Sequence, residues 1–259
     1  MITLLSLELL FFASFISVQL PTPTSRNIQL YVQNTAKELF TVSLSQKPEL
    51  KQKVEEQIPF FKEPATGSVR FGTYVPLLPI AVTLGYILGS PLILIVTGIY
   101  LLLGLVGNNN GLFLFAAGGG TSYINEPGFG YLLGIIGGAW FAGFICPDEE
   151  RKSWRQIVAS IVGVLIVHAI GLSIVFGSSI GVLLFEGEQA YLSFQPWLSE
   201  QLRNLSWYTL PYDLLFATML IALVFPLRLL FTMLMSPDIS SRHRPRVDTQ
   251  LEVLQENGV

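Results

Sequence analysis

The chain has 259 residues, of which 51% are hydrophobic and only 13% are charged, and its formal net charge is -3. The charged fraction is about half of the roughly 25% that soluble domains carry, which indicates an integral membrane protein. The chain has no large basic excess that could neutralise phosphates, so nucleic-acid binding is excluded as a function.

The first twenty residues form an apolar run that is long enough to cross a bilayer. The run lacks the basic start and the small-residue cleavage site of a secretory signal, so we expect a retained helix, with a cleaved signal as the alternative. Glu8 should face other helices or an interface, because a charge at the bilayer centre costs roughly 2.5 to 3.5 kcal/mol. Ala13 and Ser17 lie four residues apart, and such a small-residue pair favours close approach of another helix or internal packing.

Residues 21–70 are polar, with seven Lys or Arg, five Glu and a proline-rich patch near each end. We expect an extramembrane insertion that is solvated and mixed in charge. The alternative is that residues 28–40 and 47–58 form short amphipathic helices that lie on the membrane surface.

Two further apolar runs, residues 74–88 and 91–107, are separated only by the tight Gly89-Ser90-Pro91 turn. A glycine and a proline at this point end one helix and begin the next. The pattern therefore predicts an antiparallel pair of membrane helices.

The fourth apolar run, which follows Pro127, carries small residues at every fourth position: Gly130, Gly134, Gly138 and Ala142. This spacing removes side chains from one helix face, so that a neighbouring helix can pack against bare backbone. The stripe predicts tight packing and no chemistry of its own.

Two longer runs, residues 157–185 and 208–235, complete a plan of six membrane helices. Between them, residues 186–207 are polar and aromatic, and we expect a loop. Trp197 and Trp207 in this segment fit the aromatic belt that marks a membrane interface.

Six helices would place both chain ends on one side of the membrane. The basic residues after the fourth helix and in the last helix and tail predict that this side is the cytoplasm, although the seven basic residues of the insertion count against it. We therefore expect a plasma-membrane domain over residues 1–235, with both termini cytoplasmic, and a mobile tail over residues 236–259. In this orientation the insertion, the connection at 108–127 and residues 186–207 share the outer face.

Signatures of catalysis are missing from the sequence. A glycine-rich phosphate-binding loop is absent, and no serine, histidine and carboxylate set lies in a nucleophile elbow. The two histidines and the single Cys146 are too scattered for a metal site, and one cysteine cannot form an internal disulfide. We therefore expect neither an enzyme nor a cofactor, and a transported solute would draw its energy from a partner protein.

The connection between the third and fourth runs is the clearest candidate for a binding segment. At a membrane face, irregular backbone is tolerated only where it lines a cavity or meets water, so we expect part of a solute pocket here. Its candidate ligand residues are Asn108, Asn109, Asn110, Gly118, Gly119, Gly120, Tyr123 and Asn125. The glycines suit close backbone approach to a ligand, or they merely form a flexible loop.

The stretch from 112 to 145 resembles the signature of the BioY family, the biotin-binding S components of energy-coupling-factor transporters. In the cyanobacterial type, F-A-x-G-G-G precedes E-P-x-F-G-Y-L-L-G and G-A-W, which here are residues 115–120, 126–134 and 138–140. The order and spacing make this a specific match, and it extends more weakly from Val75 to the last helix. The resemblance implies an all-α membrane protein, with an S-component-like bundle of six transmembrane helices.

The resemblance also implies a function and partners. Such a protein lies in the lipid bilayer and captures biotin from outside. A transmembrane coupling subunit with ATPase subunits then drives the uptake of biotin. Ala13 with Ser17 is similar to the Ala-xxx-Ala face by which S components dock on the coupling subunit. Many members have Pro-Gly-Asp and then a lysine three residues after the acid, whereas this chain has Pro211-Tyr212-Asp213 and Phe216. An S component for another vitamin, or a membrane assembly protein of the same fold, is the alternative.

Biotin offers a ureido ring that donates and accepts hydrogen bonds, an apolar ring and chain, and a carboxylate. Asp213 is the first candidate to accept hydrogen bonds from the ureido nitrogens. The alternative is that its charge only stabilises a helix N-terminus. For the carboxylate, Arg70 ranks before Arg203. His168, in the middle of the fifth run, either contacts the ligand or bonds to a neighbouring helix.

Overall fold

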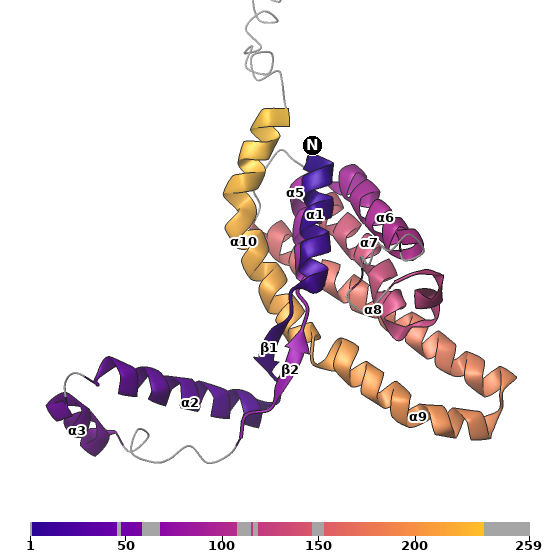
Figure 1. The fold of residues 1–259 in the computed structure, drawn as a ribbon. Coiled ribbons are helices and arrows are strands. Elements are labelled where there is room, and N and C mark those ends of the chain that lie inside the picture. The colour runs from indigo at the N-terminus through magenta and orange to yellow at the C-terminus, as the bar shows by residue number, and fades with distance from the viewer. Residues whose placement is uncertain are drawn as a thin grey trace, which may run out of the picture.

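The computed structural model describes residues 2–45, 48–58, 68–107, 115, 119–146 and 153–235. Within them, apolar helices form a bundle, and each follows one of the six apolar runs (Figure 1). These helices are α1 (Ile2–Phe15), α5 (Leu77–Leu88), α6 (Ser90–Gly107), α7 (Pro127–Ile145), α8 (Ser153–Phe185) and α10 (Leu210–Met235).

The predicted helical membrane bundle is confirmed, but the count of six complete spans is not. Four helical stretches of the described residues are long and apolar enough to cross a bilayer, whereas α1 and α5 are shorter apolar helices. Gly89 turns the chain between α5 and α6 with a φ of 77°, as the sequence predicted. The tail beyond Met235 lies outside the described residues.

The small-residue stripe of α7 packs directly on α8. A Cβ atom added at Gly134 would lie 2.6 Å from the carbonyl oxygen of Val167, and one at Gly138 would overlap the carbonyl oxygen of Gly163. Two backbones approach this closely only where no side chain intervenes. The predicted packing face is therefore confirmed.

The other side of α7 packs on α5 in the same manner. A Cβ atom at Gly85 would overlap the carbonyl oxygen of Ala139, and one at Gly143 would lie 2.7 Å from the carbonyl oxygen of Gly85. Helix α7 is thus held between two neighbours by backbone contact. The buried core surrounds this contact and includes Leu10, Val82, Ile93, Val167, Ala217 and Ile221.

The segments that flank the insertion pair as an antiparallel ribbon, β1 (Val18–Pro21) and β2 (Phe71–Tyr74). Helix α1 consequently ends at Phe15, and the expectation of one helix through residue 20 is wrong. Pro21 and Pro23 bias the residues before them toward extended backbone, which suits a strand and not a helix. The ribbon is the exception to the all-α architecture.

The insertion and the segment before α10 contain more helix than expected. The insertion forms α2 (Ser25–Ser43) and α3 (Pro48–Gln57), in agreement with the alternative of two short helices. The expected loop at 186–207 is instead α9 (Glu188–Leu202) and a π-helical turn, η3 (Arg203–Trp207). Gly187, with a φ of 88°, turns the chain from α8 into α9, and Glu, Gln, Ala and Leu favour helix after it.

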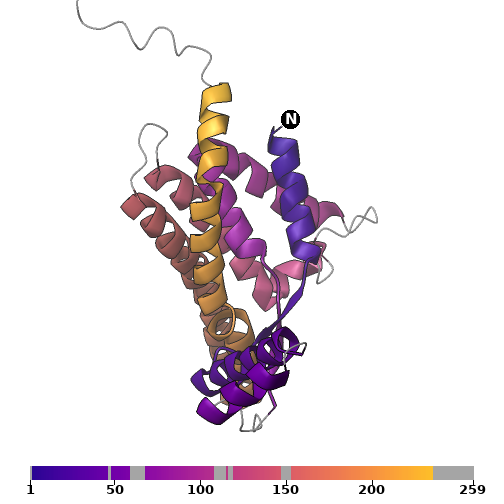
Figure 2. The ribbon, with the colours of Figure 1, turned by 90° about the vertical axis from the view of Figure 1, so that its left-hand side faces the viewer.

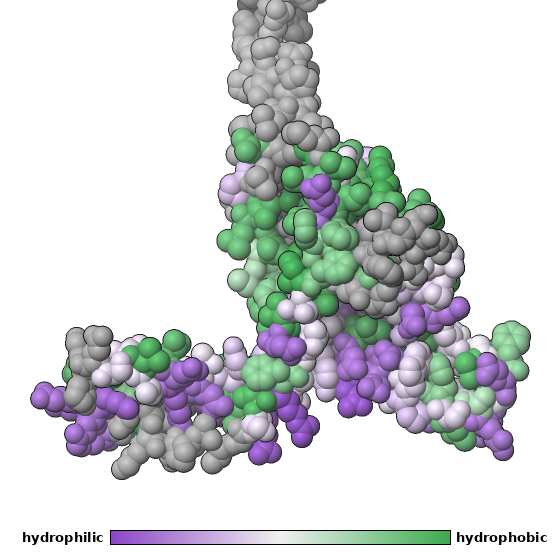
Figure 3. Space-filling model, viewed as in Figure 1, coloured by the Kyte–Doolittle hydropathy of each residue, from purple (hydrophilic) through white to green (hydrophobic). Residues whose placement is uncertain are grey.

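The chain ends and the polar elements lie at opposite ends of the bundle. Figures 1 and 2 show the N-terminus and the end of α10 together, with the ribbon, α2, α3 and α9 at the far end. Apolar residues cover the bundle between them, and hydrophilic residues gather at the far end (Figure 3). This arrangement agrees with chain ends on one side of a membrane, and the assignment of that side to the cytoplasm stays a prediction.

Replacing Gly134 by leucine should destabilise the bundle, because its side chain would meet the backbone of α8. Overpacking of this kind costs about 1 to 3 kcal/mol or more. Gly98→Leu on α6 is the matched control, since a Cβ there meets nothing within 4 Å. Thermal unfolding of both variants in one detergent should lower the midpoint only for Gly134→Leu. Equal midpoints would contradict the tight contact between α7 and α8.

Candidate functional site

A cavity of about 380 Å³ lies within the bundle near the ribbon. Its apolar wall comes from α5 and α7, where Leu77, Leu132 and Ile135 line it. A volume of this size suits a small solute. Polar side chains from several elements also reach the cavity, namely Tyr100, Tyr123, Tyr131, Asn204, Thr209 and Asp213.

Asp213 places a buried carboxylate at this cavity. Its side chain is 2% exposed, and it lies in the first turn of α10. The Tyr74 hydroxyl at the end of β2 donates to Oδ1 over 2.7 Å, and His168 Nε2 lies 3.1 Å from Oδ2. Burial of a charge is costly unless the charge is paired and hydrogen-bonded. The hydrogen bonds from Tyr74 and His168 therefore stabilise the buried carboxylate of Asp213.

The hydrogen bonds continue from Asp213 across the bundle. The Ser206 hydroxyl lies 3.2 Å from His168 Nδ1 and 2.5 Å from the Tyr131 hydroxyl. A neutral imidazole with its proton on Nε2 satisfies every contact, because Nε2–H donates to Asp213, Ser206 donates to Nδ1 and Tyr131 donates to Ser206. We call Tyr74, Asp213, His168, Ser206 and Tyr131 the polar chain.

The polar chain accounts for the burial of His168. Its ring bonds to α10 and to η3, as the alternative of a bond to a neighbouring helix predicts, and its contact with a ligand stays a prediction. Asp213 lies at the cavity, and its place in the first turn of α10 also puts its charge near a helix N-terminus. Both interpretations of Asp213 are compatible with this position and stay predictions.

An aromatic cluster forms another part of the cavity wall. The Phe115 ring lies 5.5 Å from the Tyr100 ring and 5.0 Å from the Tyr123 ring. The Tyr100 hydroxyl is buried without a hydrogen-bond partner of good geometry among the described residues, although Ser14 lies close to it. Burial and then the nearby Glu126 raise the pKa of Tyr123, so its hydroxyl stays a donor. The cluster thus offers apolar faces together with hydroxyl groups.

Among the described residues of the polar connection, Asn125, Gly119 and Gly120 do not line the cavity. Asn125 is exposed on η2 (Thr121–Asn125) and does not line it, so that prediction is wrong. The Gly120 N–H donates to the Gly104 carbonyl oxygen over 2.9 Å, and a Cβ at Gly119 would lie 2.7 Å from the same oxygen. These two glycines therefore allow close packing on α6 and not on a ligand.

The candidates Asn108, Asn109, Asn110 and Gly118 lie outside the described residues. Gly119 and Gly120 have φ angles of 104° and 89°, in the region that favours glycine.

Arg70 is not placed to meet a solute in the cavity. Its side chain is exposed beside Thr22 and Asn27, in a separate hollow beyond the ribbon. Tyr74 lies four positions further along the extended strand, a distance of about 13 Å from Arg70. The first choice for the carboxylate partner is therefore wrong, whereas Arg203 directly precedes Asn204, which lines the cavity.

Ala13 and Ser17 do not form a shared docking face. Ala13 is 1% exposed and packs inside the bundle, whereas Ser17 is exposed and lies beyond the last residue of α1. The predicted face fails because the chain leaves the helix at Phe15 to enter the ribbon.

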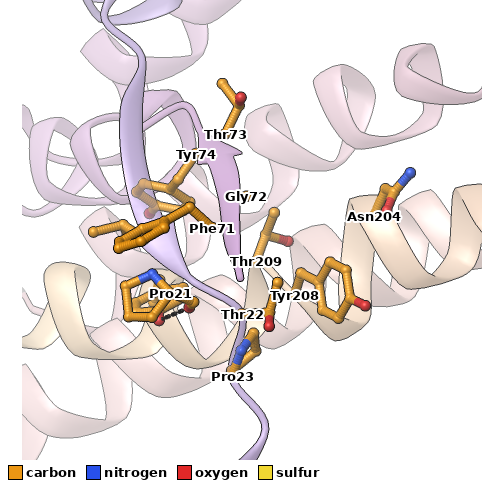
Figure 4. A pocket seen from close by; sticks show the side chains of 12 residues that line it. Pro21, Thr22, Pro23, Phe71, Gly72, Thr73, Tyr74, Asn204, Tyr208 and Thr209 are labelled. Carbon is orange, nitrogen blue, oxygen red and sulfur yellow. Dashed lines mark hydrogen bonds between the residues drawn. The ribbon is translucent and has the colours of Figure 1, made fainter. Parts of the chain in front are cut away.

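A second hollow, of about 390 Å³, adjoins the cavity between the ribbon and the start of α10 (Figure 4). The two spaces share Thr73, Asn204 and Thr209 in their walls. The Tyr212 hydroxyl donates to the carbonyl oxygen of Pro21 and so ties the ribbon to α10. The ribbon and η3 thus form the mouth of the cavity.

Most of the residues that form the polar chain and line the cavity were not predicted from the sequence. Tyr74, Ser206 and Asn204 come from the ribbon and η3, which no periodic pattern signalled. Tyr131 lies within the E-P-x-F-G-Y-L-L-G motif, so that motif was a usable signal.

Comparisons with known proteins identify the family. The BioY family model matches residues 70–232, which is more than half of the chain. A protein of Lysinibacillus sphaericus described as "Probable biotin transporter BioY" is 36% identical over 75 residues, which cover 29% of this chain and 36% of that relative. The match therefore spans about a third of the relative's length. No solved structure matches significantly.

The family match begins at Arg70, so the insertion precedes it, and it includes every helix of the bundle except α1. With this match and the helical membrane bundle that the structure shows, the chain belongs to the BioY family.

Proposed function

We propose that this chain is the biotin-binding S component of an energy-coupling-factor transporter. The observation that carries the proposal is a buried carboxylate, Asp213, at a cavity of about 380 Å³ in a chain of the BioY family. The relative described as a probable biotin transporter supports the same ligand. Members of this family act as transporter subunits, so the chain is not an enzyme.

The cavity supplies each kind of contact that biotin needs. Each oxygen of Asp213 accepts one bond within the polar chain, and each keeps a lone pair for a ureido N–H. The Tyr100 hydroxyl can donate to the ureido carbonyl oxygen. The fused apolar ring would lie against Leu132 and the ring of Tyr123.

The valeryl chain would then extend toward the mouth, which ends among polar groups. Asn204 and Thr209 line this region, and Arg203 lies beside them on η3. No Lys or Arg of the described residues lines the cavity itself. The biotin carboxylate would therefore be held by neutral donors at the mouth and by the nearby charge of Arg203.

Energy for uptake would come from partner subunits, because the sequence contains no phosphate-binding loop. In this proposal the mouth faces outward from the plasma membrane, both termini are cytoplasmic, and a coupling subunit with ATPase subunits binds the bundle.

One observation favours an S component for another vitamin. Phe216 occupies the place of the family's lysine, and its ring lies 5.5 Å from the ring of Tyr74. This exchange replaces a cation with an aromatic contact beside the polar chain. An assembly protein without a ligand is disfavoured, because the chain forms an open cavity lined by a paired carboxylate.

Purified protein should bind labelled biotin saturably, because the cavity offers acceptors for the ureido nitrogens. Equilibrium binding in detergent, with unlabelled biotin, riboflavin, thiamine and lipoate as competitors, measures this directly. Only unlabelled biotin should displace the label. Displacement by another vitamin would favour the alternative S component, and absence of any saturable binding would contradict both proposals.

Asp213→Asn should weaken biotin binding about tenfold to a hundredfold, because it exchanges an acceptor oxygen for a donor and removes a charge-assisted bond worth roughly 1.5 to 3 kcal/mol. The same variant should melt at a lower temperature, since Tyr74 and His168 lose a charged partner. Thr218→Val, which removes a bond between α10 and Ser160 away from the cavity, is the matched control and should keep its affinity. A lowered melting point with unchanged affinity would remove Asp213 from the ligand site.

A further inference from the structure

Helix α2 presents an apolar face that the described part of the chain contacts only at Tyr31, where the ring meets Phe71. Its outward residues are Ile28, Tyr31, Val32, Leu39 and Val42, which are between 38% and 66% exposed. Their spacing of three, one, seven and three residues places them within one narrow stripe of a helix. We call these five residues the α2 stripe.

Part of the polar side of α2 is less exposed than the α2 stripe. Gln33 and Lys37, on the side opposite the stripe, are only partly exposed, whereas Arg26 and Thr41 on that side are exposed. A helix in water turns its polar face outward, because exposed apolar surface costs free energy. Contact with an apolar medium would therefore stabilise the exposed α2 stripe.

The direction of α2 is fixed by side-chain contacts at its start. Asn27 is 7% exposed, its Nδ2 donates to the Arg70 carbonyl oxygen over 2.7 Å, and its Oδ1 accepts from the Arg70 N–H over 2.8 Å. The Tyr31 ring meets the Phe71 ring edge to face at 6.0 Å. Since the ribbon is bonded to α10 through Tyr212, the stripe has a defined place relative to the bundle.

The apolar surface of the bundle extends to the level of α2. Leu184 and Phe185, at the end of α8, are 72% and 89% exposed. Figure 1 shows that end of α8 at about the height of α2, which runs outward from the bundle. In Figure 3 apolar atoms appear on the upper edge of the arm formed by α2 and α3, the side of the apolar bundle, with hydrophilic atoms below them.

We propose that α2 lies in the interface of the bilayer, with the α2 stripe in contact with lipid and its polar side toward water. Lipid is the occupant that these observations select, because a bundle with membrane-spanning helices carries a bilayer surface at this level. The charges of α2 are Arg26 and Lys37 against Glu38, so apolar contact and not attraction to anionic lipid provides the binding. This helix lies outside the residues that match the BioY family.

The contact would have a consequence for the mouth of the cavity. Asn27 joins α2 to the ribbon, and Thr73 of the ribbon lines the mouth. Lipid would thus hold the ribbon from the side that faces away from α10. The proposal itself is independent of the ligand and of the proposed function.

Site-directed fluorescence in phosphatidylcholine nanodiscs tests the proposal on the full chain. Cys146→Ala removes the single native thiol, and a fluorophore is then attached at Val42→Cys, in the α2 stripe, or at Thr41→Cys, which is also exposed but lies about 100° further round the helix and outside the stripe. A quencher on the lipid chains should reduce emission several-fold more at Val42→Cys. A water-soluble quencher should show the opposite order. Leu39→Cys is the second stripe position if the label at Val42→Cys prevents folding.

Equal response of the two positions to both quenchers would overturn the proposal, because α2 would then stand in water. Protection of Val42→Cys from both quenchers would also overturn it, since a second copy of the chain or another protein would cover the stripe. Anionic lipid serves as a control and should leave the lipid quenching at Val42→Cys unchanged.

Discussion

The carboxylate of Asp213 is the constraint on which this end of the molecule depends. A buried charge must be paired, and its partners come from β2 and α8, so the ribbon and two helices converge on one residue. His168 is in turn hydrogen-bonded to Ser206, and Ser206 is hydrogen-bonded to Tyr131. Asp213 and Tyr131, two of the side chains in this set of hydrogen bonds, also line the cavity. Helix packing and the proposed ligand contact therefore depend on the same set of hydrogen bonds.

Close helix packing explains why the cavity lies where it does. Glycines bring α7 against α8 and α5 through backbone contact, which leaves no space along most of α7. Near the ribbon, Tyr131 and Leu132 of α7 line the cavity beside the aromatic cluster, while Gly130 still packs against the backbone of α8. Membrane helices without such contacts have little hydrophobic force between them, so the glycine faces and the polar chain together specify the bundle.

The sequence predicted the helices far better than the site. Apolar runs and the α7 stripe follow periodic rules, and the family motif contains Tyr131, although the sequence alone did not single this residue out for the site. Arg70 and Ser17 were misplaced because a pairing between residues 18–21 and 71–74 has no local signal. Glycines at 119 and 120 were assigned to a ligand. Their positive φ angles favour glycine, but the sequence does not tell whether the nearby group is a ligand or, as in the structure, the backbone of α6.

The central claim is that biotin occupies the cavity beside Asp213. Its most direct test is the rate at which a thiol reagent modifies Val75→Cys, whose position lines the cavity, in the Cys146→Ala background. Thr24→Cys, which lines the hollow outside the ribbon and neither the cavity nor its mouth, is the reference. Biotin should slow modification of Val75→Cys several-fold and leave Thr24→Cys unchanged. Unchanged modification of Val75→Cys under saturating biotin would contradict the account.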